Sequence, residues 1–150
     1  MLLTRDSQFL FFGSGLAEDN QFPNQINKFS VNKKEVVAVS ENPLFEKGIG
    51  SMALSPDSNS IYVATDNLLW QFSLKDGLVM QSRNVNERPD MKGATIYAMR
   101  VSKNNLYLVT GTIYIDSPEK GTERDLSVES VPVGGPVCVW STKDLTLVKT

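Results

Sequence analysis

The sequence contains no histidine and a single cysteine, Cys138. Without histidine the chain lacks the usual general base, cannot form a Ser-His-Asp triad and lacks the commonest zinc ligand. A single cysteine excludes a disulfide within the chain, and no Asn-x-Ser/Thr glycosylation site is present. We therefore expect a cytoplasmic, or otherwise intracellular, protein that uses neither histidine-dependent catalysis nor a common zinc site.

Strong charge and long apolar runs are also missing. Fifteen Lys and Arg residues against seventeen Asp and Glu give a net charge of −2, and the basic residues are scattered along the chain. Such a distribution does not neutralise a row of phosphates, so we expect no nucleic acid partner. Apolar runs such as residues 9–12 are far shorter than the roughly 20 residues that cross a membrane, so we expect no membrane span.

What the sequence does contain is a repeat at an offset of about 51 residues (52 − 1). Residues 1–7 (MLLTRDS) align with residues 52–58 (MALSPDS), and a third copy begins at residues 98–102 (AMRVS). Apolar alternation and turn residues predict four short strands in each copy. The expected strands are 1–4, 9–13, 26–31 and 35–39 in the first copy, 49–55, 61–65, 68–74 and 78–82 in the second, and 96–102, 106–111, 137–141 and 145–150 in the third. The sequence therefore predicts an all-β protein of three four-stranded antiparallel units.

Two segments carry a resemblance to a known family. Residues 55–77 (SPDSNSIYVATDNLLWQFSLKDG) and 134–150 (GGPVCVWSTKDLTLVKT) resemble WD-repeat blades, with a Ser-Pro-Asp turn, an apolar strand, an Asp turn and a third strand carrying Trp. The resemblance implies β-propeller blades at about 1–39, 49–82 and 96–150, and a non-enzymatic scaffold for protein–protein interaction. The chain departs from the family in lacking the Gly-His dipeptide and in having Trp70-Gln71 and Trp140-Ser141 instead of Trp-Asp.

Three blades are too few to close a propeller, which typically has four to eight. Two copies of the chain could form a six-bladed ring, the chain could dock onto the open array of another protein, or it could be a piece of a longer polypeptide. We favour the last two. The alternative function is accordingly a structural subunit that completes a larger assembly through its open blade edges.

The expected loops differ between the two ends of the blades. Turns at one end are short, whereas residues 14–25, 40–48, 83–95 and 112–135 form long connections at the other end, where recognition usually occurs. The candidate partner-binding residues there are Phe22, Leu44, Phe45, Arg88, Met91, Glu119, Glu123 and Arg124. The apolar ones either anchor a partner or pack against a blade, and the insert at 112–135 is either an acidic recognition loop or a tolerated insertion.

Other notable residues are expected to be structural. Trp70 and Trp140 should occupy equivalent strand positions in the core, Asp66 should accept backbone N–H bonds in its turn, and Cys138 should be a buried, inert thiol. A propeller enzyme that uses loop carboxylates remains a further alternative, although the expected inner strands carry Arg100 and no acidic residue. Residues 13–15 (GSG) lack the lysine and the helix of a phosphate loop, and we expect neither a metal nor a cofactor.

Overall fold

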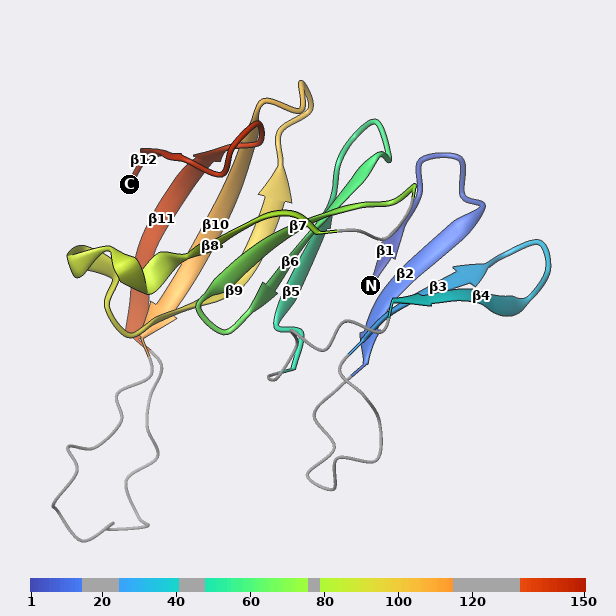
Figure 1. The fold of residues 1–150 in the computed structure, drawn as a ribbon, viewed down its shortest axis with the longest axis horizontal. Coiled ribbons are helices and arrows are strands. Elements are labelled where there is room, and N and C mark those ends of the chain that lie inside the picture. The colour runs from blue at the N-terminus through green and yellow to red at the C-terminus, as the bar shows by residue number, and fades with distance from the viewer. Residues whose placement is uncertain (15–24, 41–47, 76–78, 115–132) are drawn as a thin grey trace, which may run out of the picture.

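The computed structural model describes residues 1–14, 25–40, 48–75, 79–114 and 133–150, and within them it contains three four-stranded antiparallel sheets (Figure 1). Blade 1 consists of β1 (Leu2–Leu3), β2 (Phe9–Ser14), β3 (Gln25–Ser30) and β4 (Glu35–Ser40); blade 2 of β5 (Ser51–Leu54), β6 (Ser60–Thr65), β7 (Leu68–Ser73) and β8 (Val79–Asn84); and blade 3 of β9 (Ala94–Val101), β10 (Tyr107–Tyr114), β11 (Val133–Ser141) and β12 (Leu147–Lys149). Two short 3-10 helices, η1 (Val85–Glu87) and η2 (Pro89–Met91), join blade 2 to blade 3.

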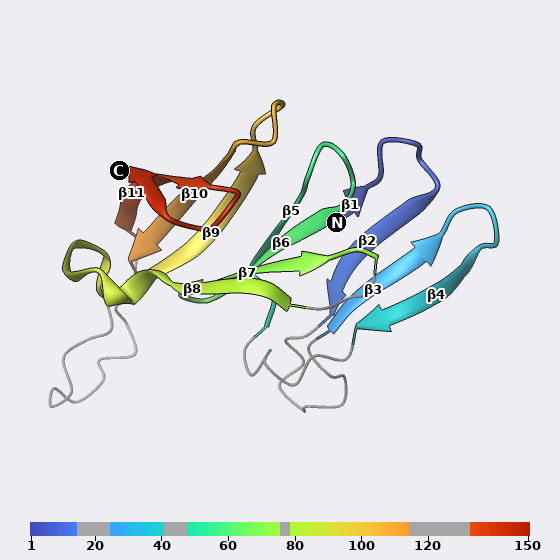
Figure 2. The ribbon, with the colours of Figure 1, turned by 45° about the horizontal axis from the view of Figure 1, so that its top comes forward.

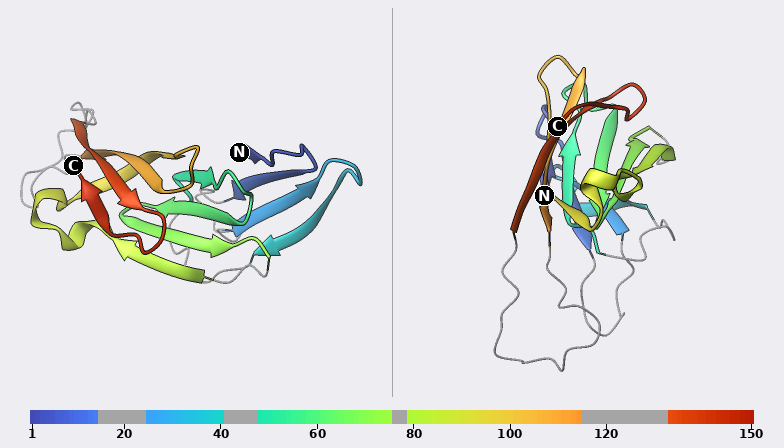
Figure 3. Two further views of the ribbon diagram at one scale, coloured as in Figure 1. Left: turned by 90° about the horizontal axis from the view of Figure 1, so that it is seen from above. Right: turned by 90° about the vertical axis from the view of Figure 1, so that its left-hand side faces the viewer.

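The blades stand side by side with their faces packed together, and they fan out when viewed along the strands (Figures 2 and 3). The first strands of the blades, β1, β5 and β9, lie next to one another on the inner side of the fan. Strands β4 and β8 lie on the outer side. This is the arrangement of consecutive propeller blades, so the predicted all-β class and the three four-stranded antiparallel units are confirmed. No helix within the described ranges is long and apolar enough to cross a membrane.

The first turn of each blade is built by the same side chains. In blade 2 the Ser55 hydroxyl donates to the Asp57 carboxylate (2.5 Å) and accepts from the Ser60 N–H (2.9 Å), while Asp57 also accepts from the Asn59 N–H (3.1 Å). Blade 1 repeats these bonds with Thr4, Asp6, Gln8 and Phe9, and blade 3 repeats them with Ser102, Asn104, Leu106 and Tyr107. A hydroxyl residue followed two positions later by Asp or Asn therefore encodes each turn.

Blade 3 shows which variants of Asp57 keep this turn, because Asn104 replaces the carboxylate there. We expect Asp57→Asn to leave the free energy of unfolding at neutral pH nearly unchanged, and Asp57→Ala to lower it by about 1 kcal/mol through loss of the hydrogen bonds from Ser55, Asn59 and Asn105. Urea unfolding followed by circular dichroism measures both values. Equal losses in the two variants would contradict this account of the turn.

The same residue predicts a dependence on pH. Hydrogen bonds from the Ser55 hydroxyl and then the Asn59 N–H hold the pKa of Asp57 below its ordinary value of 3.8. A lowered pKa in the folded state contributes stability that is complete above the ordinary value and is lost as the pH falls through the folded pKa. The acid-induced loss of stability below pH 3.8 should therefore be smaller in Asp57→Asn than in the parent chain.

The pairing register gives each blade an apolar row that crosses its four strands. Ser30, Ser73 and Ser141 pair with Phe9, Ser60 and Tyr107 respectively, and the register shift between the third and fourth strands falls at the equivalent place in every blade. The resulting rows are Leu3, Leu10, Phe29 and Val36 in blade 1; Leu54, Ile61, Phe72 and Val79 in blade 2; and Val101, Leu108, Trp140 and Leu147 in blade 3. In blades 2 and 3 the row faces the preceding blade and contributes to the core between blades.

This register corrects the predicted equivalence of the two tryptophans. Trp140 pairs with Leu108 and corresponds to Phe72, which pairs with Ile61, whereas Trp70 lies two residues earlier and corresponds to Cys138. Both indoles are nevertheless buried, and each donates its N–H to a threonine hydroxyl, Trp70 to Thr65 (3.1 Å) and Trp140 to Thr110 (2.9 Å). The predicted core role of both residues is confirmed.

Several strand ends also differ from the predictions. Strands β10 and β11 continue through Tyr114 and from Val133, so both ends of the predicted insert at 112–135 are paired strand. Strand β9 begins at Ala94 rather than residue 96, and β8 ends at Asn84 rather than residue 82. The β-branched and aromatic residues Thr112, Ile113 and Tyr114 favour a strand and extend the hairpin beyond the glycine at 111.

Candidate interaction surfaces

Only one of the four predicted long connections lies within the described residues. Six candidate binding residues, Phe22, Leu44, Phe45, Glu119, Glu123 and Arg124, lie outside them, and so does most of the predicted acidic insert. The described connection runs from the end of β8 through η1 and η2 to the start of β9. It carries the remaining two candidates, Arg88 and Met91.

Met91 is part of the core and is not available to a partner. Its side chain is 0% exposed and lies in the cluster between blades 2 and 3, with its sulfur 3.6 Å from that of Cys138. Of the two fates considered from the sequence, packing against a blade is therefore the correct one. Arg88 is partly exposed, and its guanidinium donates two hydrogen bonds to the Asp90 carboxylate (3.0 and 2.8 Å).

Asp66 joins blade 2 to the segment that enters blade 3. It has a positive φ of 57°, its carboxylate accepts a bond from the Thr95 hydroxyl (2.8 Å) and its carbonyl accepts from the Ile96 N–H (2.9 Å). The neighbouring Asn67 carbonyl accepts from the Val85 N–H (2.9 Å). The predicted bonds were from backbone N–H groups of its own turn, whereas the observed contacts run to Thr95 and Ile96 and give Asp66 a structural role in holding two blades together.

Cys138 is buried in strand β11 and 0% exposed. Burial raises the pKa of its thiol, which disfavours the nucleophilic thiolate. Tyr62, on the neighbouring blade, is equally buried, and burial raises its pKa to about 12. The prediction of a buried Cys138 is confirmed, and the raised pKa agrees with an unreactive thiol.

The inner strands of the three blades line a groove of about 980 Å³. Its walls come from β1, β5 and β9 and from the turns that follow these strands. Three basic residues line it: Arg5 from blade 1, and Arg100 and Lys103 from blade 3. The lining contains no acidic residue among the described parts of the chain, as the sequence had suggested for the inner strands.

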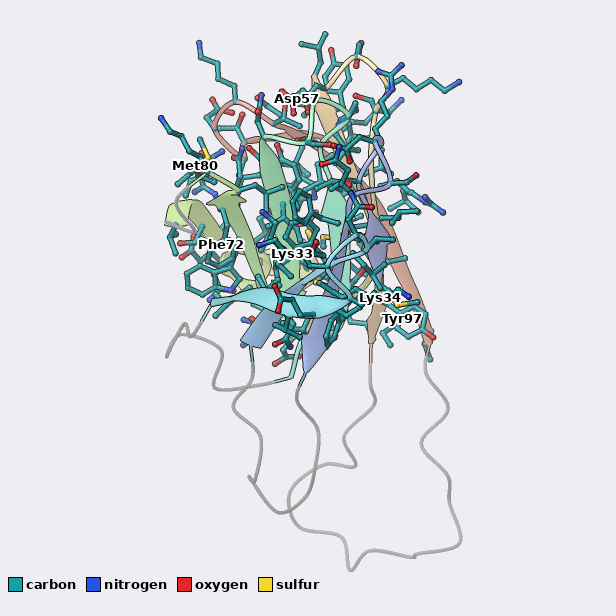
Figure 4. All side chains as sticks on the ribbon, turned by 90° about the vertical axis from the view of Figure 1, so that its right-hand side faces the viewer. Lys33, Lys34, Asp57, Phe72, Met80 and Tyr97 are labelled. Atoms are coloured by element: carbon teal, nitrogen blue, oxygen red, sulfur yellow. The ribbon has the colours of Figure 1, made fainter. Side chains whose placement is uncertain are left out.

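The groove also exposes apolar and hydroxyl side chains. Tyr97 is 70% exposed, and Met1 and Leu3 are also exposed, while blade 2 contributes Ser51 and Ser58. Asp6 and Asp57 each follow a lining residue in the sequence and accept hydrogen bonds within their own turns, and Asp57 also accepts one from the Asn105 side chain (3.2 Å). Figure 4 places Asp57 at the turn end of the blades and Tyr97 toward the opposite end. The groove thus combines basic side chains with an exposed aromatic ring.

The two end blades each have a face without a neighbouring blade in the chain. On blade 1 this open face carries the apolar row defined above, in which Leu3 and Val36 are exposed and Leu10 and Phe29 are partly exposed. On blade 3 it carries Tyr107, Val109, Val137 and Val139. Each face thus carries a group of apolar side chains, with Arg100 and Lys149 in register with Val109 and Val139 on blade 3, and the two faces lie at opposite ends of the fan (Figure 1).

Sequence reasoning missed most of the groove because its basic residues are far apart along the chain. Arg5 and Arg100 are separated by 95 positions (100 − 5), and they share a surface only because both first strands lie on the inner side of the fan. The available signal was the repeat itself, since Arg5 and Lys103 both follow the hydroxyl residue that opens the first turn.

Comparisons with known proteins agree with this architecture. No family model matches the chain, and no curated protein matches it in sequence. Among solved structures, the chain is similar to hydrazine synthase of Kuenenia stuttgartiensis (12% identity, TM-score 0.65), covering 98% of this chain and 33% of that one. It is also similar to the β-propeller domain of Cps50 (Swd1) from Myceliophteria thermophila (14% identity, TM-score 0.57), covering 93% and 37% respectively. The chain thus spans about a third of the length of these structures, and at such identities the likeness shows the fold alone: part of a β-propeller.

Proposed function

We propose that the chain is a non-enzymatic scaffold for protein–protein interaction, and that its inner groove binds an extended, acidic segment of a partner protein. The observation that carries this proposal is the lining of the groove, where Arg5, Arg100 and Lys103 stand without an acidic residue beside exposed Tyr97. Arginine pairs with carboxylates through two parallel hydrogen bonds, and exposed aromatic residues are common anchors at interfaces. The similarity to the β-propeller domain of Cps50 (Swd1) supports the fold on which the proposal rests.

The non-enzymatic part of the proposal is supported by the lack of residue types on which common catalytic mechanisms depend. The sequence has no histidine, and Cys138, its one thiol, is buried. Within the described ranges no group of three or more His, Cys, Asp or Glu side chains is placed to hold a metal ion. One structural neighbour is a hydrazine synthase, so a propeller enzyme with loop carboxylates is the alternative from another class.

Charge reversal at Arg100 tests the groove. The probe is a fluorescein-labelled peptide with glutamate at alternate positions, and its binding is measured by fluorescence anisotropy. We expect Arg100→Glu to weaken binding roughly tenfold or more, since it removes an ion pair and adds a repulsive charge in a groove. Binding should also weaken as salt is raised, and should be lost with the corresponding glutamine peptide.

Lys33→Glu is the matched control, because it makes the same change of charge on the exposed turn between β3 and β4, outside the groove (Figure 4). It should leave the peptide affinity within about twofold. Equal losses in Arg100→Glu and Lys33→Glu would mean that the peptide responds only to net charge. Failure of the parent chain to bind the peptide would contradict the proposal directly.

A second candidate function is structural: the chain completes a larger assembly through its end blades. It is favoured by the apolar side chains on both open faces, since contiguous exposed apolar surface marks sites of protein contact. The two surfaces adjoin at Arg100, which lines the groove and pairs in register with Val109 on the open face of blade 3.

A further inference from the structure

The two junctions inside the chain follow one rule. At each junction the apolar row of one blade packs against the opposite face of the blade before it. Ile61 and Phe72 of blade 2 meet Phe11 and Ile26 of blade 1, and Leu108 and Trp140 of blade 3 meet Tyr62 and Leu69 of blade 2. A junction therefore needs two different faces. The first kind is the face that carries the apolar row, and the second kind is the opposite face of the preceding blade.

The open face of blade 1 is of the first kind. Leu10 and Phe29 correspond in register to Ile61 and Phe72, which are 1% and 2% exposed. At the ends of the same row, Leu3 and Val36 are 52% and 49% exposed. The outer end of the row is exposed in blade 2 as well, where Val79 is 38% exposed, so the difference lies in the middle of the row: blade 1 leaves Leu10 and Phe29 partly exposed where blade 2 buries Ile61 and Phe72.

The open face of blade 3 is of the second kind. Val137 corresponds to Leu69 of blade 2 and Ile26 of blade 1, because these residues pair with Gly111, Ala64 and Gly13 respectively. Leu69 is 0% exposed and Ile26 is 5% exposed, whereas Val137 is 60% exposed. Val109 likewise corresponds to the buried Tyr62 and Phe11. Blade 3 thus exposes the positions that the other blades bury against a following blade.

We propose that these two faces bind each other between two copies of the chain, head to tail, to form a closed six-bladed ring. This inference rests on the structural candidate under the proposed function and names its partner, and it selects the six-bladed ring that the sequence alone did not favour. Blade 3 of each copy would receive blade 1 of the other, which repeats both internal junctions. Two such contacts form together, and a ring of three plus three blades falls within the usual range of four to eight. The inner grooves of the two copies then face a common axis.

A second copy is the occupant that the chain itself specifies, because it supplies both kinds of face in equal number. A partner carrying only one kind would leave the other face exposed to water. The apolar side chains of the contact are Leu3, Leu10, Phe29 and Val36 on blade 1 and Tyr107, Val109, Val137 and Val139 on blade 3. Two charged residues lie at the edges of the blade 3 set, Arg100 in register with Val109 and Lys149 in register with Val139, so the contact must leave both at its solvent-exposed rim.

The first experiment is the solution mass of the purified chain by size exclusion with light scattering, over a dilution series. We expect a species of twice the 16.6 kDa chain mass that does not grow at higher concentration. A monomer at all concentrations would overturn the ring, and so would open-ended growth, since a head-to-tail contact that fails to close forms filaments. In either case binding of the acidic peptide still tests the groove separately, so the two proposals can fail independently.

Two variants test which faces make the contact. Val36→Glu and Val137→Arg alter exposed side chains on the open faces of blades 1 and 3, so each should remain folded and monomeric. An equimolar mixture should restore the dimer, because one junction then joins two unaltered faces and the other joins glutamate to arginine. Met80→Glu and Leu106→Arg make the same changes at exposed positions off these faces and should leave the mass unchanged. Dimers that survive in both single variants, or a mixture that stays monomeric, would overturn the proposed contact.

Discussion

Replacing Trp140 with alanine is expected to lower the free energy of unfolding by about 3–5 kcal/mol, a large fraction of the total stability of a domain this size. The indole is 1% exposed, packs between blades 2 and 3 and donates to the Thr110 hydroxyl. Its removal leaves a cavity at the junction and an unmatched Thr110. Urea unfolding followed by far-UV circular dichroism measures the loss without depending on tryptophan fluorescence.

Phenylalanine at position 140 is the matched variant, because Phe72 occupies the equivalent place in blade 2. We expect Trp140→Phe to cost about 1–3 kcal/mol, since it keeps an aromatic ring in the junction but loses the hydrogen bond and part of the volume. If Trp140→Ala were no more destabilising than Trp140→Phe, the junction would not depend on aromatic packing at this site.

The second large effect is expected at Met91. Met91→Ala should lower the free energy of unfolding by about 2–5 kcal/mol, because the side chain is 0% exposed within the core between blades 2 and 3. Met80→Ala is the control: Met80 is 58% exposed on β8, and its truncation should change stability by less than about 0.5 kcal/mol. A Met91→Ala variant as stable as Met80→Ala would place Met91 at the surface, as a partner anchor requires.

Met91 shows why burial in connections is hard to predict from the sequence. The local sequence pattern around an apolar residue in a polar connection is the same whether its side chain faces solvent or packs against a blade. The connection carries η1 and η2, and the turn of η2 directs Met91 toward Cys138, which is 47 residues away along the chain (138 − 91). That contact depends on the packing of blade 3 against blade 2, which a local pattern does not contain.

The three-blade architecture, by contrast, followed from local signals. The hydroxyl residue and the Asp or Asn two positions later, as in Ser55 and Asp57, fix each first turn through their own hydrogen bonds. The order of strands was predictable because these signals recur in every blade. The pairing register between strands was harder to predict than their order, as the two tryptophans illustrate. Trp70 precedes Lys75 by five residues (75 − 70), whereas Trp140 precedes Lys143 by three (143 − 140), and this spacing carried the signal that the positions are not equivalent.

The groove was only partly predictable from the sequence. The absence of acidic residues on the inner strands was visible in the sequence, and so was Arg100. Its combination with Arg5 and Lys103 required the three first strands to lie on one side of the fan. Individual residue types were therefore predictable, while their juxtaposition depended on the order in which the sheets stack.

The bonds at Asp66 and Asn67 explain how the connection between blades 2 and 3 can keep its shape when side chains change. Their carbonyls accept from Ile96 and Val85, so both ends of the connection between blades 2 and 3 are fixed to a single two-residue turn. Main-chain groups make these bonds, and any residue other than proline can supply the N–H. The connector is thereby prevented from acting as a hinge, and the curvature at this step is set by backbone geometry. Side chains on the blade faces can therefore differ from blade to blade, as Phe72 and Trp140 do at equivalent positions, without changing this connection.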